Sequence, residues 1–190
     1  MSARIVALVG SLRAGSHNRQ LAEAAVGIAP EGATVELFEG LADLPFYNED
    51  IDTEAALPEA AARLRAAGAQ ADAFLLVVPE YNGTMPAVLK NAIDWLSRPY
   101  GAGAIAGKPV AVIGTAFGQY GGAWAQAEAR KAAGVAGGTV LEGVELAIPG
   151  SVTRFAETHP ADDAEVITGL SAVLNGLKAA AETPAQAATA

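Results

Sequence analysis

Three short runs of this sequence are apolar at nearly every position, and they cover residues 5–9, 73–78 and 110–114. A strand with one face in water alternates apolar and polar residues, so an uninterrupted apolar run indicates a strand that is covered on both faces. Helix-like segments separate these runs, and strands that alternate with helices are typical of a parallel sheet. We therefore expect an α/β fold with helices on both sides of the sheet.

Weaker segments complete this pattern. Residues 34–37 read as a short strand, and residues 139–148 read as a last strand pair or one interrupted strand. Helices are expected near residues 18–29, 58–69, 122–133 and 162–180, and from residue 86 onward. Five strands and five helices predict a single three-layer domain over residues 1–181, followed by a small, polar and loosely held tail at residues 182–190.

Composition excludes several classes of function. The 190 residues include no cysteine, which excludes disulfides and thiol chemistry, and only two histidines, which disfavours a metal site. The formal charge of −9 comes without a Lys/Arg cluster, so we expect no nucleic acid as partner. No apolar run approaches the roughly 20 residues that span a bilayer, and no secretory signal precedes the first strand. We expect a cytoplasmic protein without a membrane partner.

The loop after the first strand has the composition of an anion site. Residues 10–18 read GSLRAGSHN and lead into a helix, whose free N–H groups and dipole attract a phosphate. Gly10 and Gly15 have the glycine spacing of a P-loop, but Ser16 and His17 stand where that loop needs Lys and Ser/Thr, which disfavours nucleotide triphosphate hydrolysis. The alternatives are that Ser16 only caps the helix and that Arg13 is solvated.

The loop after the strand at residues 73–78 reads PEYNGTMP over residues 79–86. We expect Thr84 to be the N-cap of the next helix and Pro86 to lie in its first turn. Tyr81 either borders a ligand or packs on the core, and Glu80 either faces the ligand or is a solvated acid. Asn82 is also a residue that stabilises its own turn.

The positions of the two loops are more informative than either loop alone. They follow the first and third strands, and a flavodoxin-like sheet with strand order 2-1-3-4-5 binds FMN where those two strands diverge. One loop suits the phosphate, and the other can meet the planar ring.

Together with LKNAIDW at residues 89–95 and LPFYN at residues 44–48, these loops resemble the NADPH-dependent FMN reductase family, which includes quinone and chromate reductases. The resemblance covers roughly residues 3–150. It implies a flavodoxin-like three-layer sandwich with a five-stranded parallel sheet in the order 2-1-3-4-5. It also implies bound FMN, NADPH or NADH as electron donor, and a homodimer or homotetramer.

The resemblance also assigns roles to residues. Around the FMN phosphate it places Ser11, Arg13, Ser16, His17 and Asn18. Around the ring and ribityl chain it places Pro79, Glu80, Tyr81, Asn82 and Gly83. The third wall is residues 115–122, with contacts expected from Thr115 and Gly118, although Ala116 and Phe117 replace the Ser-Pro or other small pair of many relatives.

The implied activity is hydride transfer from NAD(P)H through bound FMN to a small oxidant. Quinones are the expected acceptors, and chromate, azo compounds and free flavin are further candidates. The flavin N5 carries the chemistry, so no catalytic side chain and no metal is expected. The alternatives are a flavodoxin-like electron carrier, which would not oxidise NAD(P)H directly, and a flavin-binding protein without turnover.

Overall fold

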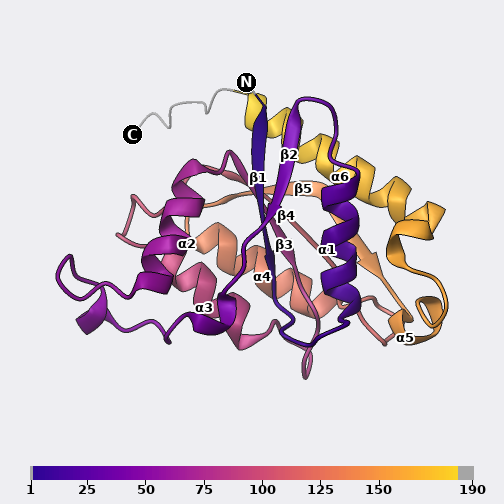
Figure 1. The fold of residues 1–190 in the computed structure, drawn as a ribbon, viewed down its shortest axis with the longest axis horizontal. Coiled ribbons are helices and arrows are strands. Elements are labelled where there is room, and N and C mark those ends of the chain that lie inside the picture. Colours follow the sequence, from indigo (N-terminus) through magenta and orange to yellow (C-terminus); the bar gives the residue numbers. More distant parts are fainter. Residues whose placement is uncertain (1, 184–190) are drawn as a thin grey trace.

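A computed structural model describes residues 2–183 of the chain (Figure 1). Five strands form one sheet in the order β2-β1-β3-β4-β5, and every neighbouring pair is parallel. The strands are β1 (Ala3–Val9), β2 (Ala33–Leu37), β3 (Ala73–Val77), β4 (Pro109–Thr115) and β5 (Thr139–Ile148). The predicted fold class and strand order are confirmed. Residues 184–190 of the predicted tail lie outside the described residues.

Helices cover both faces of the sheet (Figure 1). Helices α1 and α6 pack on one face, and α2, α3 and α4 pack on the other. Their bounds are α1 (His17–Gly27), α2 (Glu59–Gln70), α3 (Ala87–Leu96), α4 (Ala123–Val135) and α6 (Ala164–Glu182). A further short helix, α5 (Ser151–Arg154), follows β5 and was absent from the sequence prediction.

The apolar strands explain the two cores. Along β1, Val6 and Leu8 enter the core under α2 and α3, whereas Ile5 and Ala7 enter the core under α1 and α6. Successive side chains of a strand point to opposite faces, so a strand between two helical layers must be apolar at every position. This burial on both faces explains why the strand segments are apolar at every position.

One local detail differs from the sequence prediction, and one alternative that the sequence left open is decided. Thr84 is not the N-cap of α3, because Pro86 holds that position with extended backbone and the helix begins at Ala87. Thr84 instead pairs with Tyr81 across a tight turn, which removes it from the helix start. The last strand is one strand, β5, with a register irregularity opposite residues 110–112 of β4.

An ion pair joins α5 to the first turn of α6. Arg154 donates to both carboxylate oxygens of Asp163, at 2.7 and 2.9 Å. Asp163 Oδ1 also accepts from the N–H groups of Glu165 and Val166, so the same side chain caps α6. The hydrogen bond from Arg154, and to a smaller extent those from the two backbone N–H groups, lowers the pKa of Asp163 to about 2.

We expect Asp163→Asn to change how stability depends on acid. Because the pKa of Asp163 is lower in the folded state, its charge stabilises the fold at pH values above the unfolded pKa of 3.8. This contribution is lost as the pH falls toward about 2. The variant keeps a capping oxygen but loses the charge, so its free energy of unfolding should change less with pH over that range. Asp163→Ala should lose about 1 kcal/mol more, because the cap is removed too. Urea unfolding at stepped pH measures both, and identical pH profiles for wild type and Asp163→Asn would contradict the assignment.

Candidate functional site

Three loops meet at the carboxyl ends of β1, β3 and β4 and enclose a cleft of about 150 Å³. Nine of the twelve predicted site residues line it: Ser11, Arg13, Ser16, His17, Asn18, Pro79, Glu80, Tyr81 and Thr115. The first two loops are closely packed, since a Cβ on Gly10 would lie 3.1 Å from Pro79 Cδ and 3.2 Å from Pro86 Cγ. The structure thus brings together segments that are far apart in the sequence.

The loop after β1 presents donors to the cleft. Ser16 is the N-cap of α1, and its Oγ accepts from the N–H of Arg19 at 3.4 Å. Within residues 2–183, the N–H groups of His17 and Asn18 in the first helical turn have no hydrogen-bond acceptor. Arg13 lies beside them and is exposed. Two free N–H groups, a helix N-terminus and a guanidinium together suit an anion.

Asn18 ties this loop to the end of β4. Its side chain is 5% exposed. Its Nδ2 donates to the carbonyl of Thr115 at 2.8 Å, and its Oδ1 accepts from the N–H of Thr115 at 2.9 Å. The Thr115 hydroxyl donates in turn to the carbonyl of Ile148, at 2.9 Å. Asn18 therefore fixes the shape of the cleft, with one amide hydrogen left for a ligand.

His17 lies at the edge of the cleft. Burial lowers its pKa below the ordinary value, and the positive charge of Arg13 lowers it further. Its ring lies edge-on to Phe155, with centroids 5.5 Å apart. The lowered pKa favours the neutral imidazole, which offers one N–H donor to a ligand.

The loop after β3 forms a two-residue hairpin. Tyr81 and Thr84 exchange backbone hydrogen bonds of 3.0 and 3.1 Å, and Asn82 and Gly83 between them have φ of +53° and +75°. This is the type I′ turn, which favours Asn-Gly because both central residues need positive φ. Asn82 and Gly83 lie at the hairpin tip and do not line the cleft. Tyr81 is half-exposed beside the cleft, with its hydroxyl 3.5 Å from Ser11 Oγ.

Glu80 has a structural partner. The N–H of Ala125, in the first turn of α4, donates to Glu80 Oε2 at 3.2 Å. A carboxylate at a helix N-terminus is stabilised by the free N–H groups and by the helix dipole. Glu80 therefore joins the loop after β3 to the start of α4 while it lines the cleft.

The third wall differs in part from the prediction. Ala116 and Phe117 line the cleft, whereas Gly118 does not. Phe117 is 76% exposed at the cleft edge. Ser151, the first residue of α5, also lines the cleft. The sequence did not predict Ser151, because a four-residue helix after the last strand has no periodic signal. The glycine at position 150 was the one local cue, and in the structure its φ is +65°.

This set of groups fits FMN. The donors at the start of α1 suit a phosphate monoester, and about 150 Å³ accommodates the phosphate end rather than the whole molecule. The half-exposed Tyr81 and the exposed Phe117 offer aromatic surface for a planar ring at the edge of the cleft. Phosphate inside and ring at the rim is the arrangement that these residues support.

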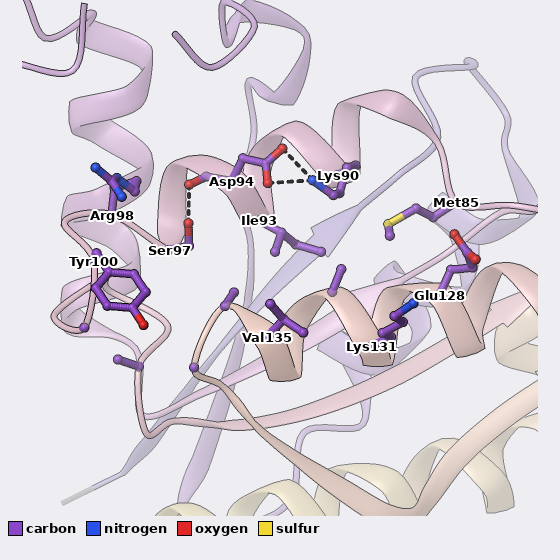
Figure 2. Close-up of a pocket in the computed structure, with 15 residues that line it drawn as sticks. Met85, Lys90, Ile93, Asp94, Ser97, Arg98, Tyr100, Glu128, Lys131 and Val135 are labelled. Atoms are coloured by element: carbon purple, nitrogen blue, oxygen red, sulfur yellow. Dashed lines mark hydrogen bonds and ion pairs between the residues drawn. The ribbon is translucent and has the colours of Figure 1, made fainter. Parts of the chain in front are cut away.

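A larger cavity of about 760 Å³ lies elsewhere, between α3 and α4 (Figure 2). It shares no residue with the cleft. None of the twelve predicted site residues lines it. Its position away from the strand ends separates it from the candidate FMN site.

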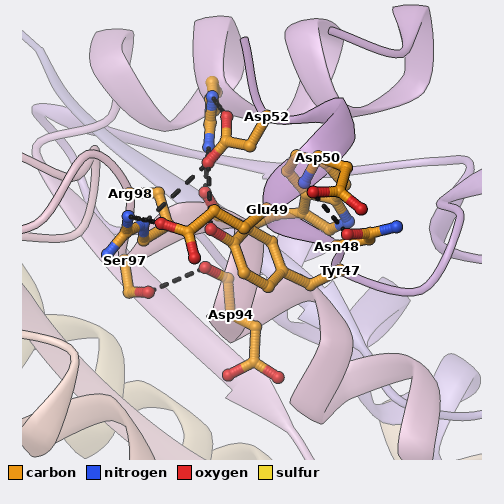
Figure 3. A network of polar contacts seen from close by, with 10 residues as sticks. Tyr47, Asn48, Glu49, Asp50, Asp52, Asp94, Ser97 and Arg98 are labelled. Carbon is orange, nitrogen blue, oxygen red and sulfur yellow. Dashed lines mark hydrogen bonds and ion pairs between the residues drawn. The ribbon is translucent and has the colours of Figure 1, made fainter. Parts of the chain in front are cut away.

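The loop after β2 forms a polar network of its own (Figure 3). Tyr47 donates to Asp52 at 3.2 Å, and Arg65 binds Asp52 through two hydrogen bonds of 2.7 and 2.9 Å. These contacts with Arg65 lower the pKa of Asp52. Arg98 lies nearby, 3.6 Å from Glu49. The network fastens the loop to α2 and to the end of α3, and its residues do not line the cleft.

No helix within residues 2–183 is long and apolar enough to cross a membrane. The same residues contain no group of three His, Cys, Asp or Glu side chains placed to hold a metal ion.

A family model and two curated relatives match this chain. The family model of the NADPH-dependent FMN reductases matches residues 3–153. The chain is 45% identical over 130 residues to a 2-hydroxy-1,4-benzoquinone reductase of Burkholderia sp. The match covers 68% of this chain and 69% of the relative. It is 39% identical over 159 residues, 84% of either chain, to a quinone reductase of Pseudomonas putida.

A solved structure also resembles this chain in fold and sequence. FerB, a flavoenzyme NAD(P)H:(acceptor) oxidoreductase from Paracoccus denitrificans, superposes with a TM-score of 0.83 at 34% identity. The match covers 95% of this chain and 97% of that protein. The family resemblance carried by the sequence motifs is thereby confirmed.

We expect Asn18→Ala to destabilise the protein by about 2 kcal/mol, because the buried N–H and carbonyl of Thr115 would lose their partners. Chemical denaturation measures the free energy of unfolding. Ser11→Ala is the matched control. Ser11 also lines the cleft, and among residues 2–183 its hydroxyl makes only the 3.5 Å contact with Tyr81, so the variant should stay within about 0.5 kcal/mol of wild type. Equal stability of the two variants would contradict the role of Asn18.

Proposed function

The chain belongs to the NADPH-dependent FMN reductase family and is an FMN-dependent NAD(P)H oxidoreductase; from this premise we propose that its acceptor is a quinone. The two relatives above are named for quinone reduction, one of them for a hydroxylated benzoquinone. The exposed Phe117 and Tyr81 at the cleft edge support a flat aromatic acceptor, since aromatic rings stack on such surfaces.

One observation carries the assignment of the site. The phosphate-type loop after β1 and the hairpin loop after β3 line the same cleft. We propose that Arg13, Ser16 and the N–H groups of His17 and Asn18 bind the FMN phosphate. Tyr81, Phe117 and the backbone near Pro79 then border the ring. Asn82, Gly83 and Gly118 are outside the cleft lining, and Asn82 and Gly83 shape the hairpin turn through their positive φ.

Bound FMN supplies a site that accepts hydride from NAD(P)H and passes two electrons to the acceptor. The protein's contribution is to bind and orient. Donors at the start of α1 fix the phosphate end, and the bonds from Asn18 to Thr115 hold the neighbouring loops in place. Fixed hydrogen-bond donors and a fixed ring position lower the entropic cost of aligning NAD(P)H, flavin and acceptor.

We also propose that the chain works as a homo-oligomer. The cleft is small compared with the 300–1,000 Å³ of ordinary ligand sites, so a bound ring would remain partly uncovered in one copy. A cytoplasmic location, where NAD(P)H is supplied, stays a prediction from the sequence.

Turnover by the FMN-loaded protein tests the proposed function. We expect NADPH or NADH to bleach the flavin absorbance without oxygen, and 2-hydroxy-1,4-benzoquinone to restore it faster than chromate, an azo dye or free FMN. Steady-state oxidation of both nucleotides across this panel gives the acceptor preference. A protein that binds FMN but oxidises neither nucleotide would contradict the oxidoreductase assignment and favour an electron carrier.

We expect Arg13→Ala to weaken FMN binding about tenfold or more, because it removes a charge-assisted hydrogen bond to the phosphate. Fluorescence titration of apoprotein with FMN measures the dissociation constant. Arg19→Ala is the matched control, since Arg19 lies on α1, pairs with Glu23 and Glu39, and does not line the cleft. Equal affinity in the two variants would remove Arg13 from the phosphate site.

A further inference from the structure

Ser151 is a buried residue of the cleft whose hydroxyl has no partner in the described chain. It is 6% exposed, and within residues 2–183 its Oγ takes part in no hydrogen bond; the nearby side-chain bonds come from Thr115 and Arg154. Among the same residues, Arg98 Nε is the one fully enclosed polar side-chain atom without a partner. The Ser151 hydroxyl therefore keeps access to the cleft that it lines. Buried hydroxyls are normally paired, so an unpaired one in a cleft points to a ligand.

Backbone hydrogen bonds fix the position of Ser151. Its N–H donates to the carbonyl of Ala116 at 3.0 Å, and the N–H of Ala116 donates to the carbonyl of Ile148 at 3.2 Å. These two bonds continue the pairing of β4 with β5 past the ends of both strands. Gly150 then turns the chain into α5 with φ of +65°, a conformation that favours glycine. Ser151 is therefore fastened to the third wall of the cleft.

Two side chains hold α5 beside the start of α1 (Figure 1). Phe155 is buried in the core under α1 and α6, with its ring edge-on to that of His17. Arg154 binds Asp163 through two hydrogen bonds of 2.7 and 2.9 Å. The N–H of Phe155 also donates to the carbonyl of Ser151 at 3.0 Å, so the anchored end of α5 supports its first residue. A hydroxyl on such a support is preorganised for a ligand.

The support of this hydroxyl is connected to the phosphate-type loop at two points. Asn18 binds both backbone groups of Thr115, whose hydroxyl donates to the last carbonyl of β5. The ring of His17 meets that of Phe155, one helical turn after the serine. Both connections lead to the first turn of α1, which carries the free N–H donors, and not to the hairpin loop after β3. The hydroxyl is therefore placed toward the phosphate end of the cleft.

We propose that the Ser151 hydroxyl donates a hydrogen bond to the FMN phosphate from the third wall of the cleft. A phosphate monoester has three terminal oxygens that accept strongly, and the donors at the start of α1 come from one wall alone. A hydroxyl on another wall adds a charge-assisted bond that riboflavin, which has no phosphate, cannot receive. Ser151 thus favours FMN over riboflavin. This inference rests on the proposed phosphate site and adds to it a residue more than 130 positions away in the sequence.

Ligand affinities of the apoprotein test the role of Ser151. We expect Ser151→Ala to raise the dissociation constant of FMN about tenfold, because one charge-assisted hydrogen bond is lost. The dissociation constant of riboflavin should stay within about twofold of wild type. Thr153→Ala is the matched control, since it removes a hydroxyl from an exposed position of the same helix that does not line the cleft. It should keep both wild-type affinities. Fluorescence titration with each flavin measures all of them.

Stability of the same variants separates a ligand contact from a structural role. An unpaired buried hydroxyl does not stabilise the apoprotein, so Ser151→Ala should unfold at the same urea concentration as wild type or at a higher one. Saturating FMN should raise the urea midpoint less in Ser151→Ala than in wild type, because a ligand stabilises in proportion to its affinity. A lower midpoint of the Ser151→Ala apoprotein would show an internal role of the hydroxyl and overturn the proposal.

The outcomes distinguish this inference from the proposals on which it rests. Equal losses of FMN and riboflavin affinity in Ser151→Ala would place the contact on the ribityl chain and overturn the phosphate contact. Unchanged FMN affinity in Ser151→Ala, with wild type still preferring FMN to riboflavin, would overturn the role of Ser151 alone. Equal binding of both flavins by wild type would overturn the phosphate site at α1 as well. Failure of the loaded protein to oxidise NAD(P)H would contradict the proposed function without altering these dissociation constants.

Discussion

Strand β1 pairs with β2 on one side and with β3 on the other, and the chain leaves β1 and β3 toward opposite faces of the sheet. Helix α1 follows β1 on one face, and α3 follows β3 on the other. The two loops must therefore diverge, which leaves a crevice at the carboxyl ends of these strands. The phosphate donors, the hairpin and the third wall all depend on this change of winding direction.

Within the crevice, some groups hold the structure and others remain free. Asn18 binds both backbone groups of Thr115, and Glu80 accepts from the start of α4. The N–H groups of His17 and Asn18 are left without an acceptor in the described chain, and Arg13 is exposed. A site with preorganised walls and unpaired donors binds an anion without first breaking internal hydrogen bonds, which keeps the cost of binding low.

Local signals predicted the parallel sheet and its two helical layers, and the family resemblance supplied the strand order and the position of the cleft. Apolar runs identify the buried strands, and the composition of GSLRAGSHN predicts an anion loop. The sequence did not predict which side chains are used internally, since the partner of Asn18 is 97 residues away. It placed Thr84 as a helix cap, whereas the Asn82-Gly83 turn pairs Thr84 with Tyr81. The groove between α3 and α4 could not be predicted, because it exists only when the two helices are packed.

We propose that the start of α1 recognises a phosphate and thereby selects FMN. The most direct measurement compares the dissociation constants of FMN and riboflavin, which differ by that phosphate, for the same apoprotein. We expect FMN to bind about a hundredfold more tightly than riboflavin, or better, since several charge-assisted hydrogen bonds go to the phosphate. Equal affinity for FMN and riboflavin would contradict it.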